Sequence, residues 1–557
     1  MKNTKDLAVQ AIFAFLGLLA INLLANFFFF RWDITEDKRY TLSETSLQTL
    51  KKIETPILIE VLLKGDIPPT FKKLQTETMQ LLEEYVSENN HIRVQFINPL
   101  EGESNPEQTL NELTQMGLTP LQITQSEAGK SSIAHIFPWA IINDGIHTEK
   151  VALFTNSIGA TDQEQVQRSV QRLEYNFTDA LHKLTLEKQK KIAVLKSNGT
   201  LEDIYIADFL KTAGNYYRIA PFSLDSVAVN PEKTLQQLNE FDLLLIAKPT
   251  QPFTDVQKQV VDQFIMQGGK TLWMVEQVNI GIEDLYNAQG TAMAMPVDLN
   301  LGDMFFQYGF RLNYNLINDL YFTEIVIASG QGNQSRYLPL PWLYHPMVIS
   351  KNNHLINKNL DATRLQFANS IDTLQNGIQK TILLSSSALS KVEGTPREIS
   401  LKIDPKKMDK AGYNQGNFPV SVLLEGQFNS VYKNRIPPIE MKDQKEVSSH
   451  TKMMVISDGD FIKNEIASNT PLELGYDKWT HKFYDNKSFL MNALNYLLDE
   501  NDLLTLRNKK VQLAFLDKAK IEDNQKAWQL KSILLPLLIV LILSFLVKIY
   551  HKKTYSR

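Results

Sequence analysis

The 557-residue sequence contains no cysteine. This absence excludes disulfides, thiolate zinc sites, iron–sulfur clusters and a cysteine nucleophile. The sequence also has no excess of one charge: 22% of its residues are charged, and its net charge is −4. A nucleic-acid-binding domain would need a basic face, so we expect no nucleic-acid partner. At this length the chain is expected to form several domains.

The motifs of nucleotide and hydrolytic chemistry are absent as well. Glu127–Ser132, "EAGKSS", matches the end of a phosphate-binding loop, but the glycine that the full pattern needs is replaced by Thr124. A loop between strands is the better interpretation of this segment. There is no Gly-x-Ser-x-Gly or His-Glu-x-x-His pattern, and the nine histidines are scattered. We therefore predict no catalytic residue, no metal site and no cofactor.

The sequence has only two long uncharged hydrophobic runs, one near each end. Residues 7–30 carry no charge and are long enough to cross a bilayer. A cleaved signal peptide is the alternative, but it would be shorter and would end in small residues, whereas this run ends in Phe27–Phe30. We therefore predict an uncleaved anchor over 7–30, which surfaces into water at Arg31 and Trp32.

The second run is "SILLPLLIVLILSFLV", Ser532–Val547, between Lys531 and Lys548. Trp528 and Tyr550 lie where an aromatic belt would be, so the predicted span is 528–550, after a juxtamembrane segment over 501–527. A buried core helix is the alternative interpretation. The terminal position, followed only by a basic tail, favours the span.

Two spans place both termini on one side of the membrane and the intervening chain on the other. Basic residues at 548–553 favour a cytoplasmic C-terminus, although lysines also precede the span. We therefore expect a protein of the cytoplasmic (inner) membrane, in contact with its lipid. Both termini would be cytoplasmic and residues 31–530 periplasmic.

Residues 41–160 have the pattern of a small α/β domain. Thr41 and Glu44 fit a capping box, and Pro56 would end the helix that they begin. The further elements predicted are strands at 56–63, 91–97, 134–142 and 148–153 and a helix at 71–87. A strand–helix–strand unit predicts a parallel pair, so we expect a thioredoxin-like fold.

A connecting helix over 161–188 leads to a larger domain over 189–500. Its first part alternates short apolar strands with helices, which predicts an open, doubly wound parallel sheet. The strands are predicted at 191–196, 216–221, 241–249 and 270–275, and the helices at 201–213, 231–239 and 254–267. Farther along we expect a helix at 299–308, strands at 381–385, 419–425 and 452–457, and a helix at 488–499. Residues 321–342, 391–417 and 437–451 are predicted to be loops.

A ligand site, if there is one, would lie at the carboxyl edge of this sheet, where open α/β sheets bind their ligands. Asp458 and Asp460 follow one predicted parallel strand, and Asn198 and Gly199 follow another. The alternative is that the aspartates only cap the following turn, as aspartates commonly do.

Several stretches resemble the family of gliding-motility-associated ABC transporter auxiliary proteins typified by GldG of the Bacteroidetes. They are "DITEDKRYTLSE" (33–44), "LEYNFTDALHKL" (173–184), "LLEGQFNSVYKNR" (423–435), "VISDGDFIKN" (455–464) and "NKSFLMNALNYLLDE" (486–500). The order of these stretches and the two flanking hydrophobic runs extend the resemblance over nearly the whole chain.

The resemblance implies an auxiliary, so-called substrate-binding subunit that acts with a multi-span permease and a separate cytoplasmic ATPase. It also implies a glutamine-amidotransferase-like fold for the larger domain. Those enzymes use a cysteine nucleophile, which this chain lacks, so their activity is not expected here. Relatives often have a Gly-His-Gly-Glu-like turn after the first strand, where this chain has Ser197-Asn198-Gly199-Thr200.

Our leading hypothesis is a non-enzymatic, double-anchored auxiliary subunit involved in gliding motility. A periplasmic receptor that binds a glycan or peptide at Asn198, Asp458 and Asp460 is the second hypothesis. A hydrolase with an unfamiliar site is the third, and it lacks an identifiable nucleophile.

Overall fold

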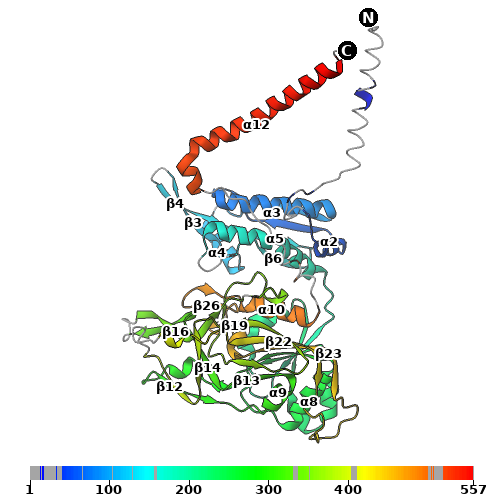
Figure 1. Ribbon diagram of the computed structural model, residues 1–557, viewed down its shortest axis with the longest axis vertical. Helices are drawn as coiled ribbons and strands as arrows, with labels where there is room; N and C mark the ends of the chain where they lie inside the picture. The colour runs from blue at the N-terminus through cyan, green and yellow to red at the C-terminus, as the bar shows by residue number, and fades with distance from the viewer. Residues whose placement is uncertain are drawn as a thin grey trace.

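The computed structural model describes most of the region between the two hydrophobic runs, and the C-terminal run (Figure 1). The described residues are 13, 15–17, 33, 35, 41–65, 67–102, 105–127, 130–155, 160–329, 336–350, 352–402, 410–499, 504, 506 and 518–555. They form two α/β bodies, each with its own sheet, which we call the small body (41–185) and the large body (189–499). Of the predicted N-terminal span only Phe13 and residues 15–17 are described, and these are helical.

The small body is built on a four-stranded mixed sheet. Its strand order is β2-β1-β5-β6, with β1 and β2 parallel and the other neighbours antiparallel. The predicted parallel strand–helix–strand unit is confirmed, while the thioredoxin-like assignment stays a prediction. The elements are α2 (Glu44–Lys51), β1 (Ile57–Val61), α3 (Pro69–Glu88), β2 (Ile92–Phe96), α4 (Pro106–Gln115), β3 (Leu121–Glu127), β4 (Lys130–Ile136), β5 (Trp139–Asn143), β6 (Thr148–Ala152) and α5 (Asp162–Thr185).

Helix α5 packs on the sheet of the small body. It begins at a capping box, in which the Thr161 hydroxyl accepts from the Glu164 N–H and the Glu164 carboxylate accepts from the Thr161 N–H. Val170, Leu173 and Phe177 are buried in the core that α5 shares with α2, α3 and the strands. The segment predicted as a connecting helix is therefore also a structural part of the small body.

Two details of the small body differ from the sequence prediction. Ser43, and not Thr41, caps α2: its side chain accepts from the backbone N–H of Ser46, and Glu44 is already helical. The single strand predicted over 134–142 is two strands, because Pro138 has no N–H and separates β4 from β5. The "EAGKSS" segment belongs to the β3–β4 hairpin, in which Glu127 and Lys130 are paired.

The large body contains a seven-stranded sheet in the order β19-β22-β23-β10-β9-β7-β8. The run from β8 to β23 is parallel, and β22 and β19 continue it antiparallel. Helices α7, α8 and α9 pack on one face, and α6 and α10 pack on the other. The predicted doubly wound parallel sheet is confirmed in its strands and helices. The amidotransferase-like assignment stays a prediction.

The elements of the large body, in chain order, are β7 (Lys191–Leu195), α6 (Asp203–Ala213), β8 (Arg218–Phe222), η1 (Leu224–Ala228), α7 (Pro231–Leu238), β9 (Leu243–Ala247), α8 (Asp255–Met266), β10 (Lys270–Met274), β11 (Val278–Asn279), η2 (Glu283–Leu285), β12 (Thr291–Pro296), α9 (Gly302–Tyr308), β13 (Phe310–Leu312), β14 (Asn315–Asp319), β15 (Phe322–Ser329), β16 (Arg336–Val348), η4 (Leu355–Asn357), β17 (Thr363–Arg364), β18 (Ile371–Thr373), β19 (Gln379–Ser385), β20 (Ser390–Gly394), β21 (Arg397–Ser400), η6 (Lys410–Gly412), β22 (Pro419–Asn429), β23 (Val447–Ile456), η7 (Gly459–Ile462), β24 (Ile466–Ala467), β25 (Thr470–Pro471), β26 (Tyr476–Asp477), β27 (Lys482–Phe483) and α10 (Asn486–Leu497).

A buried carboxylate ties α8 to the segments around it. The Asp262 side chain accepts hydrogen bonds from the Tyr308 hydroxyl (2.7 Å), the Ser430 hydroxyl (2.6 Å) and the backbone N–H of Val431 (2.9 Å). Burial raises the pKa of Asp262, while these hydrogen bonds act to lower it. The carboxylate thus joins α8 to α9 and to the turn after β22.

Three segments predicted as loops contain strands. Residues 321–342 contribute the long β15–β16 hairpin, residues 391–417 contribute β20 and β21, and β23 begins at Val447 inside the third segment. The prolines of β16 weakened the strand signal, because proline cannot donate to a sheet. In the structure Pro339 lies opposite Val326 and Pro341 lies opposite Glu324, at positions where the pairing with β15 needs no N–H from either proline.

The two bodies meet along α5. Arg168 forms an ion pair with Asp361, and the Arg172 guanidinium donates to the backbone carbonyl of Asn359 (2.5 Å). The hydroxyl of Tyr216 donates to Asp179 (2.6 Å). These polar contacts hold α5 against the large body.

Helix α12 (Lys518–Tyr555) carries the second hydrophobic run, with a non-helical residue, Asn524, near its start. Residues Lys526–Lys553 are long and apolar enough to cross a membrane, and none of the most apolar window is buried in the protein. Figure 1 shows α12 in red, projecting beyond the small body on the side away from the large body. A core helix would be buried, so this exposed helix is a candidate membrane span, and it contains the span predicted over 528–550.

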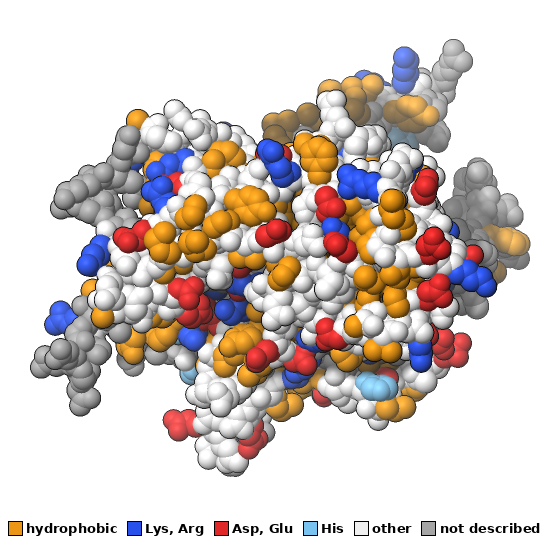
Figure 2. All heavy atoms as spheres, turned by 90° about the horizontal axis from the view of Figure 1, so that it is seen from below, with side chains coloured by type: hydrophobic (Ala, Val, Ile, Leu, Met, Phe, Trp, Pro, Cys, Tyr) orange, Lys and Arg blue, Asp and Glu red, His pale blue; other side chains and the backbone are white. Residues whose placement is uncertain are grey.

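The opposite end of the molecule has a mixed surface. Figure 2 shows this end of the large body, where acidic and basic side chains are interspersed with apolar ones. The described residues on this face form no large patch of one charge.

Candidate functional site

The carboxyl edge of the large sheet gathers four charged side chains from three neighbouring strands. Lys248 follows β9, Glu276 follows β10, and Asp458 and Asp460 follow β23. The order β23-β10-β9 brings these strand ends together. We call these four residues the edge cluster.

Lys248 is the cation of the edge cluster. Its ammonium lies 3.2 Å from a carboxylate oxygen of Glu276 and 2.6 Å from one of Asp460. The second oxygen of Asp460 is 3.7 Å from the ammonium of Lys463. The side chains of Glu276 and Asp460 are each 7% exposed, so these ion pairs are buried.

The backbone holds Lys248 in an uncommon conformation. Its φ of +50° lies in the left-handed region, which residues other than glycine rarely adopt. Gly459 packs against the lysine stem so closely that an added Cβ would lie 2.5 Å from the Lys248 Cγ. Glycine at position 459 is therefore needed to let the stem reach the carboxylates.

The pKa values of the edge cluster follow from burial and from these ion pairs. Burial acts to lower the pKa of Lys248, but attraction to Glu276 and Asp460 more than offsets it, so the pKa is raised. Burial raises the pKa of Glu276 to about 7, against the effect of Lys248. For Asp460 the nearby lysines outweigh burial and lower the pKa. The cluster is thus centred on an ion pair between Lys248 and Asp460.

Asp458 has the capping role that the sequence left open as an alternative. Its side chain accepts from the backbone N–H groups of Asp460 (2.8 Å) and Gln366 (2.7 Å). Burial, together with the charge of Asp460, raises its pKa well above the usual range. Asp458 therefore anchors the turn after β23 to the segment around Gln366.

The edge cluster is a poor metal site although it has enough carboxylates for one. Oxygens of Glu276, Asp458 and Asp460 lie within 4.8 Å of one another. Calcium and magnesium would be held by such oxygens, but the ammonium of Lys248 already lies between two of the carboxylates. A divalent cation would have to displace this buried ammonium, so the residues present do not fit a metal.

Asn198 and Gly199 lie at the same sheet edge but in a different contact. The Asn198 amide donates to the side chain of Gln257 (3.0 Å) and to the carbonyl of Pro252 (3.3 Å). Gly199 packs against Thr250, where a Cβ would lie 2.2 Å from the hydroxyl. Because β7 is three strands from β23, about 14 Å separates the two strand ends. Asn198 therefore does not join Asp458 and Asp460 in one site.

The sequence analysis missed Lys248 and Glu276. Lys248 lies near the end of the strand predicted over 241–249, in "LLLIAKP", and Glu276 directly follows the strand predicted over 270–275, in "TLWMVEQ". Asp458 directly follows its own predicted strand in "VISDGD". A charged residue at the end of several predicted parallel strands was the available signal. This signal shows which residues meet only when the strand order is known, and the sequence does not show the strand order.

A cleft of about 940 Å³ opens beside the edge cluster. One wall contains Lys478 and Trp479, and the other contains Leu401 with Ile282, Glu283, Leu285, Tyr286 and Asn287. Glu324–Ile327 of β15 lies between them, and Lys463 links the cleft to Asp460.

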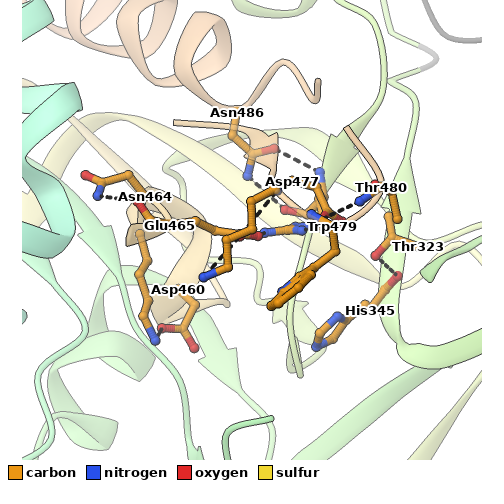
Figure 3. Close-up of polar contacts among 12 residues, drawn as sticks. Thr323, His345, Asp460, Asn464, Glu465, Asp477, Trp479, Thr480 and Asn486 are labelled. Atoms are coloured by element: carbon orange, nitrogen blue, oxygen red, sulfur yellow. Dashed lines mark hydrogen bonds and ion pairs between the residues drawn. The ribbon is translucent and has the colours of Figure 1, made fainter. Parts of the chain in front are cut away.

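The polar floor of the cleft contains one buried histidine. His345 is 4% exposed, and its Nε2 has no hydrogen-bond partner among the described residues. Burial and the nearby Arg364 hold its pKa well below the usual range, so the imidazole is neutral. Arg364 is itself paired with Glu465 (3.3 Å) and Asp477 (3.2 Å). Figure 3 shows His345 and Trp479 together with the acidic residues Asp460, Glu465 and Asp477.

Comparison with protein families identifies the large body. A family model described as "ABC-type uncharacterized transport system" matches residues 189–493, which is more than half of the chain. The chain belongs to this family. A second model, for a domain of unknown function, matches residues 36–143 and so covers most of the small body. The protein is thus associated with ABC-type transport, and the resemblance to GldG-type auxiliary proteins agrees with this match.

Individual relatives are distant. An uncharacterised protein of Borreliella burgdorferi is 21% identical over 356 residues, which are 61% of this chain and 64% of that protein. The aligned part of the chain therefore spans less than two thirds of this curated relative.

Solved structures are also only distantly similar. The mmIFT52 N-terminal domain has a TM-score of 0.32 and 12% identity, covering 55% of this chain and 97% of that domain. A ThuA-like protein from Parabacteroides merdae has a TM-score of 0.28 and 7% identity, covering 59% of this chain and 94% of that protein.

Proposed function

We propose that the protein is a non-enzymatic auxiliary subunit of an ABC transporter complex involved in gliding motility. The observation that carries the proposal is the family match over residues 189–493. Its partners would be a multi-span permease in the membrane and a separate cytoplasmic ATPase. The part of the proposal that concerns gliding motility rests on the resemblance of five stretches to GldG-type proteins. One of these stretches, 455–464, contains Asp458 and Asp460 of the edge cluster.

A double membrane anchor fits this role. The exposed apolar part of α12 is long enough for the second span, and residues 7–30 are uncharged over a similar length. Both termini would then be cytoplasmic, with residues 31–530 periplasmic beside the permease. Because α12 projects past the small body, the small body would lie nearer the membrane than the large body (Figure 1).

The chemistry of the edge cluster supports a structural role and not catalysis. A nucleophilic lysine must be neutral, whereas the raised pKa of Lys248 keeps its ammonium protonated. The chain has no cysteine that could act as an amidotransferase nucleophile. The edge cluster therefore stabilises the turns at the carboxyl edge of the sheet.

The alternative receptor at Asn198, Asp458 and Asp460 is not favoured by this geometry. Asn198 is engaged with Gln257, Asp458 caps a turn and Asp460 is paired with Lys248. A ligand would have to break these contacts.

Purification of the native complex tests the proposed function. The tagged full-length protein is extracted from its own membranes in a mild detergent, and the proteins that remain bound are identified by mass spectrometry. We expect a multi-span permease and an ATPase in near-stoichiometric amounts. An unrelated tagged inner-membrane protein with two spans is the control. Recovery of neither subunit, or equal recovery with the control, would contradict the proposal.

A further inference from the structure

Strand β15 has one open edge, and that edge lies in the cleft. The sheet order is β15-β16-β17, so β15 pairs only with β16 among the described strands. Four consecutive residues, Glu324–Ile327, line the cleft. Neighbouring residues of a strand point to opposite faces, so a run of four reaches the cleft through the strand edge and not through one face.

The prolines of β16 fix which backbone groups point into the cleft. Val326 pairs with Pro339 and Glu324 with Pro341, and neither proline has an N–H. The paired hydrogen bonds of this antiparallel ladder must therefore be made at Ile325–Leu340 and Ile327–Leu338. As a result, the N–H and C=O groups of Glu324 and Val326 point away from β16, towards the open edge.

The two walls of the cleft flank the two faces of β15. On one face, Ile325 and Ile327 pack in the hydrophobic cluster that contains Leu285, Ile282 and Leu401. Tyr337 lies on the other face, which it shares with Val326, and the centre of its ring lies 5.3 Å from that of Trp479. The edge of β15 therefore lies in the cleft, with an apolar cluster packed on one face of the hairpin and the Tyr337–Trp479 pair on the other.

The charges of the cleft are already paired within the protein. Glu324 lies 3.3 Å from Lys482, Glu283 lies 3.5 Å from Lys463, and Arg364 binds two carboxylates. A charged occupant would have to compete with these pairs. The remaining lining is largely apolar and aromatic, including Tyr286, Tyr337 and Trp479, whose side chains are about half exposed.

From these features we infer that the cleft binds an uncharged, extended polypeptide segment, which adds as a fourth strand to the edge of β15. Main-chain hydrogen bonds to Glu324 and Val326 would supply affinity, and alternate apolar side chains of the peptide would meet the two walls. Four strand residues span about 13 Å, enough for a peptide core of four to six residues. This inference goes beyond the proposed transport role and does not depend on the identity of the permease.

Peptide selection on the intact protein tests this inference. The full-length protein in detergent micelles is exposed to a displayed library of random uncharged heptapeptides, and an enriched peptide is synthesised with a fluorophore. We expect enriched sequences with apolar residues at alternate positions. In hydrogen exchange, the bound peptide should protect amides within residues 322–329. Failure to enrich any peptide over empty micelles would overturn the inference.

Two substitutions at one position separate strand addition from other binding. Val326→Pro removes the outward N–H but leaves the hydrogen bonds to β16, and should weaken peptide binding at least about tenfold. Val326→Thr keeps the N–H and should bind within about twofold of the wild type. Both variants are checked for an unchanged thermal unfolding midpoint.

A peptide variant provides a test on the unaltered protein, should Val326→Pro unfold. The same peptide with N-methyl groups at alternate residues cannot pair with a strand edge, and should not bind. Equal binding of the N-methylated peptide, or protection confined to segments outside 322–329, would refute strand addition. Strand addition of a peptide would also be refuted if the protein without peptide forms a dimer in light scattering and the dimer protects residues 322–329 in hydrogen exchange.

Discussion

Replacing Lys248 by methionine removes the ammonium that lies between Glu276 and Asp460 while keeping a similar stem. The ion pair with Asp460 is buried and has an N–O distance of 2.6 Å. Removing one partner of a buried pair leaves an uncompensated charge and costs ~3–5 kcal/mol. At roughly 2–4 °C per kcal/mol, the unfolding midpoint should fall by roughly 6–20 °C.

The assay is thermal unfolding of the full-length protein in detergent, followed by tryptophan fluorescence, because Trp273 is fully buried in the same sheet. Lys482→Met is the matched control. It removes the same group from an exposed pair with Glu324, whose loss should cost under about 1 kcal/mol. The double variant Lys248→Met, Asp460→Asn should recover part of the loss, because it removes the stranded carboxylate. If Lys248→Met costs no more than Lys482→Met, the ion pair does not hold this sheet edge together.

Three further substitutions test other parts of the core. Burial raises the pKa of Glu276 from 4.5 to about 7, so between these pH values the folded state keeps a proton that the unfolded state loses. The free energy of unfolding should therefore fall as the pH rises through this range. In urea titrations at several pH values, Glu276→Gln should make that fall shallower. Asp262→Ala leaves three buried hydrogen-bond donors without their acceptor, and should lower the free energy of unfolding by about 3 kcal/mol or more. The exposed Asp372→Ala should lower it by less than about 1 kcal/mol in the same titrations. Gly459→Ala should displace the Lys248 stem and cost ~1–3 kcal/mol, and an unchanged unfolding midpoint would contradict the close packing there.

The parallel sheet could be predicted from the sequence because its signals are local. Each of β7, β9 and β10 is a short continuous apolar run, as strands buried on both faces are. Thr254 and Gln257 form a capping box that marks the start of α8, and glycines mark its end. These patterns depend on neighbours in sequence and need no tertiary contact.

The β15–β16 hairpin could not be predicted because its prolines are acceptable only in one register. Pro339 and Pro341 lack the N–H that a strand normally donates, and this predicts a loop. In the fold both prolines take positions whose N–H would point away from β15, so no hydrogen bond of that pair is lost. Only the tertiary register resolves the conflict.

Only two of the four residues of the edge cluster were predicted, because the other two join it through tertiary packing. Asp458 and Asp460 are two residues apart in sequence, and the prediction placed both at the carboxyl edge of the sheet, where the structure has them. Lys248 and Glu276 come from other strands, and the order β23-β10-β9 brings them together. The same order places Asn198, which follows β7, out of reach of the aspartates. Strand order is set by long-range packing, so it was not available from local pattern.

The proposed periplasmic position of residues 31–530 can be tested by labelling with a membrane-impermeant maleimide, because the chain has no cysteine of its own. Ile436→Cys, at a side chain that is 95% exposed on the large body, and Lys553→Cys, beyond the second span, each introduce the only thiol. In intact spheroplasts we expect the thiol at position 436 to be labelled and the thiol at position 553 to be labelled only after lysis. Labelling of position 553 but not of position 436 in intact spheroplasts would place the two bodies in the cytoplasm and contradict the proposed transporter subunit.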